Sequence, residues 1–265
     1  MAPPAFPFEI HSMIIRFATH TPVFFDLSPD PQFWPVDDKL SGCIAADYAT
    51  KKALTRVSRQ FRYLSLPILY QVVKVHKGSN MHLLADVLDV TSSRTATPRQ
   101  NPRKIEYLFV SLGTMKTSDQ RVIFAVFNSL GRVLTRCGRL RGFGLYDTSP
   151  YRLSTPCYWW RAIPDGVRFV DWHGTIMACD FAQMIDRVSE SLISLRFSKF
   201  LHKNTSPHVS LPKLTHLSIV EGFGDVLENW SAQSLTHLSL NVRCTWPKSN
   251  RTHVDFNNPQ GFTES

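Results

Sequence analysis

Apolar positions recur at helical spacing near the start of the chain. They are Ile10, Met13, Ile14 and Phe17. Residues three and four apart lie on one face of a helix, so the pattern predicts a short amphipathic helix. Pro7 and Glu9 suit its first turn, where a missing N–H and a negative charge are both tolerated.

Four prolines break this pattern between residues 21 and 46. A proline cannot continue a helix, and a loop of this length is uncommon in a compact unit, so we expect an insertion here. Helical spacing resumes in the series Leu54, Val57, Phe61 and Leu64. We expect Pro67 to interrupt this second helix.

A strand, a helix and a linker are expected next. Alternation at Val73 and Val75 predicts the strand. The helix is predicted by apolar residues at helical spacing, Met81, Leu84 and Leu88. Residues 92–103 are rich in Ser, Thr, Pro and Arg, which is typical of a linker.

One pattern repeats along the second half of the chain. Residues 234–240, Ser-Leu-Thr-His-Leu-Ser-Leu, match residues 213–219, Lys-Leu-Thr-His-Leu-Ser-Ile, almost one for one. The spacing apolar-x-x-apolar-x-apolar recurs earlier, beginning at Ile105, Leu140, Val167 and Leu192. Successive copies begin 35, 27, 25, 22 and 21 residues apart. These separations are near or somewhat above the ~20–29-residue period of leucine-rich repeats.

Helical patterns fall between these predicted strands. One comprises Ile123, Val126, Leu130 and Val133, after a capping box at Thr117 and Gln120. Others comprise Phe181, Met184, Ile185 and Val188, and then Val226, Leu227 and Trp230. A repeated strand and helix is the unit that stacks into a curved solenoid, so we expect a mixed α/β fold.

The composition is that of a folded protein, with 43% hydrophobic, 12% aromatic and 19% charged residues. A formal net charge of +9 brings nucleic acid into consideration. The densest basic groups fall on predicted helical segments: Lys51, Lys52, Arg56, Arg59 and Arg62, and then Arg132, Arg136, Arg139 and Arg141. Because the basic residues are otherwise dispersed, solvated helix faces explain them better than a nucleic-acid interface.

Cysteine usage favours a reducing compartment. The five cysteines form no Cys-x-x-Cys pair, so we expect reduced thiols and no metal site. The first residues lack the basic start and apolar run of a signal peptide, and no stretch approaches the ~18 apolar residues of a membrane span. We therefore expect a soluble protein of the cytoplasm, the nucleus or both.

No catalytic motif stands out. Gly142-Phe143-Gly144 lacks the third glycine of a dinucleotide motif, and carboxylates are too sparse to nominate a pair. His216 and His237 occupy the same repeat position, which indicates a structural or surface role. We expect no catalytic, metal or cofactor site, and hence no enzyme.

Residues 6–17 and 54–75 together resemble an F-box, in the form common among fungal F-box proteins. The family opens with Leu-Pro-x-Glu-Ile, and Phe6-Pro7-Phe8-Glu9-Ile10 stands in that place. The family continues with Leu-x-x-Val-Cys/Ser-Arg-x-Trp/Phe, and residues 54–61, Leu-Thr-Arg-Val-Ser-Arg-Gln-Phe, match it.

The resemblance implies the substrate-recognition subunit of a Skp–cullin–F-box ubiquitin ligase. Such a subunit binds the Skp adaptor, and through it cullin, while its repeats bind a protein target. Short helices cannot bury all their apolar surface alone, so a partner must cover part of it. The residues expected to carry the adaptor contact are Phe6, Pro7, Glu9, Ile10, Ile14, Leu54, Val57, Leu66, Leu69 and Tyr70. A place in the intramolecular core explains Ile14 and Val57 equally well.

Tyr158, Trp159, Trp160 and Arg161 are candidates for target binding, because aromatic residues and Arg dominate interface hot spots. Packing between two irregular repeats explains these rings better, since large aromatics also dominate cores.

The expected organisation has four parts. They are an F-box domain over 1–76 with an insertion at 21–46, a helix and linker over 77–103, an irregular leucine-rich-repeat-like solenoid over 104–246, and a flexible tail over 247–265. Two alternatives stay open. One is a basic repeat protein that binds nucleic acid or acidic partners; the other is a divergent or truncated F-box-like protein without a ligase role.

Overall fold

The computed structural model describes part of the chain: residues 7–19, 46, 48–94, 105–112, 119–146, 158–173, 176–197, 200–201, 208–219 and 229–240. Phe6, almost all of the expected insertion and the expected tail lie outside these residues. The chain is mixed α/β, as expected.

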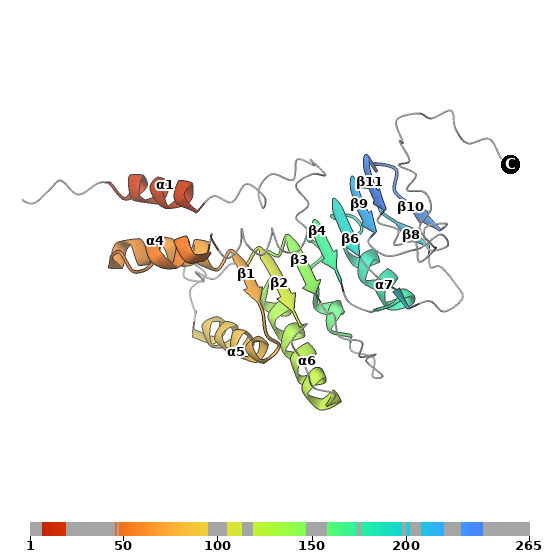
Figure 1. The fold of residues 1–265 in the computed structure, drawn as a ribbon, viewed down its shortest axis with the longest axis horizontal. Coiled ribbons are helices and arrows are strands. Elements are labelled where there is room, and N and C mark those ends of the chain that lie inside the picture. The colour runs from red at the N-terminus through yellow and green to blue at the C-terminus, as the bar shows by residue number, and fades with distance from the viewer. Residues whose placement is uncertain are drawn as a thin grey trace, which may run out of the picture.

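A parallel sheet of seven strands, arranged in the same order as in the sequence, forms the centre of the molecule (Figure 1). Its strands are β1 (Val72–Val75), β2 (Tyr107–Ser111), β3 (Gly142–Tyr146), β4 (Phe169–Trp172), β6 (Ser194–Phe197), β9 (His216–Ile219) and β11 (His237–Leu240). Two small parallel sheets pair β5 (Ile176–Met177) with β7 (Phe200–Leu201), and β8 (Val209–Ser210) with β10 (Trp230–Ser231).

The repeated apolar pattern sets the register of the central sheet. Its second apolar positions are paired across neighbouring strands, namely Leu108, Phe143, Val170, Leu195, Leu217 and Leu238. Its third positions form a parallel row, namely Val110, Leu145, Trp172, Phe197, Ile219 and Leu240. Alternate residues of a strand point to one face, so both rows share one face of the sheet.

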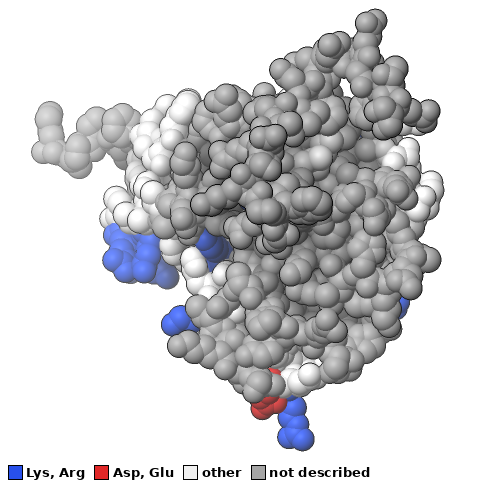
Figure 2. All heavy atoms as spheres, turned by 45° about the vertical axis from the view of Figure 1, so that its right-hand side comes forward, with Lys and Arg blue, Asp and Glu red and all other residues white. Residues whose placement is uncertain are grey.

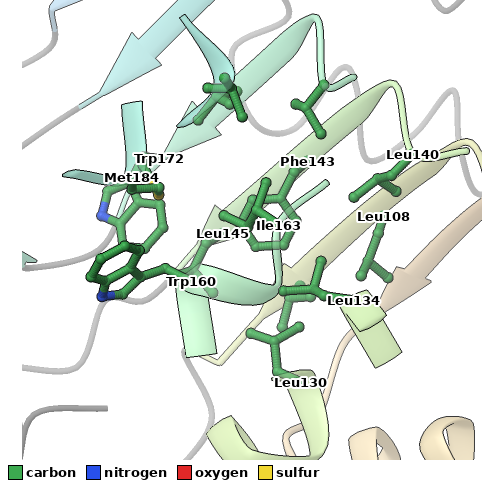
Figure 3. Close-up of a cluster of buried hydrophobic side chains, with 14 of the residues drawn as sticks. Leu108, Leu130, Leu134, Leu140, Phe143, Leu145, Trp160, Ile163, Trp172 and Met184 are labelled. Carbon is green, nitrogen blue, oxygen red and sulfur yellow. The ribbon is translucent and has the colours of Figure 1, made fainter. Parts of the chain in front are cut away.

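Helices cover that face. They are α5 (Ser79–Arg94), α6 (Gln120–Arg136) and α7 (Ala178–Val188), and the 3-10 helix η3 (Tyr158–Ala162) lies between β3 and β4. Figure 1 shows α5, α6 and α7 on the same side of the sheet. The labelled leucines of α6, β2 and β3 gather with Trp160 and Ile163 into one buried cluster (Figure 3). The core therefore lies between the sheet and these helices.

The start of α6 differs from the expected capping box. Asp119 is the N-cap, and its Oδ1 accepts a hydrogen bond from the Arg121 N–H at 2.9 Å. A carboxylate at this position accepts from a free N–H and is stabilised by the positive end of the helix dipole. Gln120 is therefore the first residue of the helix and not the last residue of a capping box.

Two predictions about the helices near the start of the chain were wrong. The series from Leu54 to Leu64 spans a helix over 48–54 and a second helix, α4 (Arg59–Leu69). Ser58 separates them, because its Oγ accepts from the Phe61 N–H at 3.1 Å and caps α4. Pro67 lies inside α4 and does not interrupt it.

Other boundaries also differ from the expected ones. Helix α1 (Phe8–Ala18) forms where the apolar stripe predicted it, and β1 and α7 are confirmed as well. Helix α5 runs to Arg94, into the expected linker. Trp230 is in strand β10, not in a helix, because its backbone pairs with Val209. Val226 and Leu227 lie outside the described residues.

Candidate functional site on the N-terminal helices

Helix α1 is stabilised at both ends by its own residues. Pro7 precedes it, Glu9 lies in the first turn, and Arg16 lies in the last turn. These charges complement the helix dipole. Thr19 ends the helix, and its hydroxyl donates to the Ile15 carbonyl at 2.7 Å.

One face of α1 packs against α4. Ile15 is fully buried, and the His11 and Phe61 rings meet edge to face with centroids 5.1 Å apart. Ser65 of α4 is also fully buried. Since α1 and α4 bury few large side chains, most of the apolar surface of this unit stays uncovered.

The N-terminal helical unit exposes a group of large apolar side chains, here termed the N-terminal apolar surface: Phe8, Ile10, Met13, Ile14 and Phe17 of α1, with Val57 and Tyr63. Phe17 is 76% exposed and Tyr63 73%. Within α1, Ile10, Met13, Ile14 and Phe17 follow the helical spacing that normally marks a core-facing stripe. An exposed apolar stripe rimmed by polar residues is typical of an interaction site.

Exposed basic side chains lie on the same helical segments as this surface. The exposed ones are Arg16, Lys52, Arg56, Arg59 and Arg62, whereas Glu9 is the one acidic residue among described positions 7–70. On the face drawn in Figure 2, Lys and Arg side chains gather at one edge of the molecule. The surface therefore suits a partner with apolar and acidic groups.

The other basic group of the sequence is largely engaged within the protein. Arg132 pairs with Asp86 at 2.9 Å and with Asp89 at 2.6 Å, and Arg136 pairs with Asp89 at 2.9 Å. These contacts join α6 to α5. Arg139 and Arg141 lie beyond the end of α6, so the expectation that they are helical was wrong.

The expected adaptor-binding residues fall into two sets. Pro7, Glu9, Ile10, Ile14 and Val57 are exposed. Leu54, Leu66, Leu69 and Tyr70 are half-buried. The exposure of Ile14 and Val57 removes the core explanation for both side chains.

Sequence reasoning did not nominate Phe8, Met13, Phe17 or Tyr63 for this contact. Met13 and Phe17 carried a signal, since they share the helical stripe of Ile10 and Ile14. Helical spacing identifies the stripe but does not say whether the fold covers it.

Trp159 and Trp160 of η3 pack into the core, whereas the side chain of Tyr158 lies outside what the structure describes. Trp160 is buried, and Trp159 stacks between Phe127 and Trp172, with centroids 5.5 Å away on each side. Arg161 is exposed, and its guanidinium lies 5.4 Å from the Trp160 ring centroid. This placement favours the packing interpretation over target binding.

Other chemistry is limited in the part of the chain that the structure describes. Burial raises the pKa of the Cys137 thiol to about 12, so this cysteine is not a nucleophile. The described residues contain no group of three or more His, Cys, Asp or Glu side chains arranged to hold a metal ion. Among these residues, no helix has the length and apolar character needed to cross a membrane.

No family model, no curated protein and no solved structure matches the chain. The candidate site therefore depends on the sequence and the geometry alone.

Proposed function

We propose that the chain is a non-enzymatic adaptor of the F-box type, which binds a Skp adaptor through its N-terminal helices and a protein target through its repeats. The observation that carries this proposal is the apolar stripe of α1, with Ile10 and Ile14 exposed while their neighbour Ile15 is buried. The sequence of the two N-terminal segments, which resembles an F-box, supplies the class of partner.

The arrangement of the repeats supports the second half of the proposal. Parallel strands in sequential order, with helices on one side, are what a stack of strand–helix units produces. An irregular solenoid of this kind offers an extended surface for a target. By holding the target near a conjugating enzyme, the adaptor raises the effective concentration of the target without contributing catalytic groups.

Co-purification with a Skp adaptor and cullin tests the proposal. The full chain is compared with an Ile10→Asp/Ile14→Asp variant, which places two charges on the exposed stripe and leaves the buried Ile15 intact. A Leu83→Asp/Val87→Asp variant is the matched control, because these exposed residues of α5 have the same spacing on a helix. We expect the wild type and the control to retain the Skp adaptor and the α1 variant to lose it.

Two results would overturn the proposal. One is a folded wild-type chain that does not retain the Skp adaptor. The other is retention by the α1 variant at the level of the α5 control, since the contact would then lie elsewhere.

A further inference from the structure

The second face of the sheet, turned away from α5, α6 and α7, carries both aromatic and polar side chains. Strand alternation assigns to it the residues between the core rows. They include Tyr107, Phe109, Tyr146, Phe169, Asp171, Ser194, Arg196 and His216. Tyr107 and Phe109 form a separate cluster with Val72, against which Tyr146 and Phe169 pack.

Asp171 of β4 is a buried carboxylate on this face, with only 2% of its side chain exposed. Its Oδ2 accepts a hydrogen bond from the Tyr146 hydroxyl at 2.6 Å. Its Oδ1 lies 2.8 Å from Nε2 of His173, but the contact lies outside hydrogen-bond geometry, and neither atom has a hydrogen-bond partner. A buried carboxylate oxygen without a donor is costly.

His216 of β9 presents a second buried acceptor. The Thr215 hydroxyl donates its one hydrogen to the Ile193 carbonyl at 3.1 Å, so its oxygen can only accept from Nδ1–H of His216, 2.6 Å away. Burial, and then the neighbouring His237, lower the pKa of His216 to about 4, so the ring is neutral at pH 7. Its Nε2 is therefore a lone-pair acceptor, and it has no donor.

Ser194 of β6 lies between these two acceptors in the sheet. It is paired with His216 on one side and with Phe169 on the other. Its hydroxyl is buried and has no hydrogen-bond partner. Three adjacent strands thus hold buried polar groups that have no hydrogen-bond partner among the described residues. Most of these groups are hydrogen-bond acceptors.

Aromatic rings lie beside Asp171. The residue paired with it on β3 is Gly144, and a Cβ there would approach Phe109 Cδ1 to 2.6 Å and Tyr146 Cε2 to 3.2 Å. These two rings therefore occupy the space next to the carboxylate. The Tyr146 ring also stacks on His173, with centroids 5.2 Å apart. Tyr146 and Phe169 are half-buried.

We propose that this face binds a lysine or arginine side chain of a target protein, with the cationic group donating to Asp171 and further donors of the same peptide segment reaching Ser194 and His216. The proposal gives the adaptor its class of target and to that extent rests on the proposed function. A carboxylate beside aromatic rings attracts a cation. Arg196 of β6 is paired with Asp171 on the same face, so the cation of a target competes with Arg196 and with His173 for the carboxylate.

Peptide pools with one fixed central residue test this proposal. The full chain is titrated with fluorescent pools that carry Arg, Lys, Gln, Glu or Leu at the centre and mixed neutral residues around it. We expect the Arg and Lys pools to bind about tenfold more tightly than the others. The chain itself carries a net charge of +9, which works against non-specific binding of basic peptides.

Two substitutions locate the site. Asp171→Asn removes the charge and keeps an oxygen for the Tyr146 hydroxyl, and we expect it to abolish the roughly tenfold preference for Arg and Lys. Ser194→Ala, a second variant, leaves the carboxylate in place. We expect it to weaken the binding of the Arg pool and of the Lys pool severalfold. Asp165→Asn, the same change on an exposed carboxylate, is the control and should leave binding unchanged. Thermal unfolding confirms that each variant is folded.

The proposal is overturned if all pools bind a folded wild type equally or not at all, or if Asp171→Asn keeps the preference. Adaptor docking uses α1 and is measured separately. A chain that prefers basic peptides but does not retain the Skp adaptor would contradict the proposed function and still support the cation site.

Discussion

Gly142 and Gly144 stand where neighbouring strands of the sheet carry side chains. A Cβ on Gly142 would lie 2.4 Å from Tyr107 Cδ1, and one on Gly144 would lie 2.6 Å from Phe109 Cδ1. Real Cβ atoms do not come this close to ring carbons, so each ring would have to move. The two glycines let the aromatic rings of β2 lie across β3.

Replacing Gly144 with alanine is therefore expected to destabilise the protein by about 1–3 kcal/mol, because Phe109 is buried and has little room to shift. Gly138→Ala is the control. No atom lies within 4 Å of a Cβ at Gly138, so we expect no loss there. Chemical denaturation measures both free energies of unfolding. Equal free energies of unfolding for the two variants would show that the Phe109 ring leaves room for a Cβ at position 144.

At the scale of elements, neighbouring residues of α1 have opposite environments. Ile15 is fully buried and Ile14 is 45% exposed. We expect Ile15→Ala to lower the free energy needed to separate α1 from α4 by about 2–4 kcal/mol, because the substitution leaves a cavity. Ile14→Ala should cost less than about 0.5 kcal/mol. Hydrogen exchange of the α1 amides compares the two variants, and similar protection in both would show that α1 does not pack through Ile15.

The strands were more predictable from the sequence than the helices of the N-terminal unit. The apolar rows of β2 to β11 keep one spacing, and a sheet with one covered face requires that spacing, so position and register followed from it. The break at Ser58 was missed because apolar residues on both sides of the cap keep the same period. A cap depends on one local hydrogen bond, which hydrophobic periodicity does not report.

The candidate sites were predictable to different degrees. The F-box resemblance pointed to α1, but exposure depends on which helix packs against it, and the sequence does not give that packing. Asp171 carried little signal, because a single carboxylate between Val170 and Trp172 is unremarkable until parallel pairing sets it beside Gly144 and Arg196. Its significance comes from contacts between segments far apart in the sequence.

At the scale of the whole molecule, charge separates the two proposed sites. The N-terminal apolar surface shares its helical segments with exposed basic residues, so its partner should be steered by acidic groups, whereas the second face of the sheet takes a basic segment through Asp171. Opposite preferences at two places on one chain keep each partner away from the wrong site.

This arrangement predicts that retention of the Skp adaptor falls with salt. Between about 0.05 and 0.5 M salt we expect the association rate to fall roughly tenfold, because screening removes the steering by exposed charges. Arg59→Glu/Arg62→Glu should lower the rate at low salt, since both residues lie on α4, which carries part of the apolar surface. Arg121→Glu/Arg139→Glu changes the net charge by the same amount at exposed positions away from it and should have little effect. Association rates that do not respond to salt, or that fall equally in both variants, would mean that net charge or apolar contact alone governs docking. The exposed basic residues of α4 would then be solvated surface with no part in partner choice.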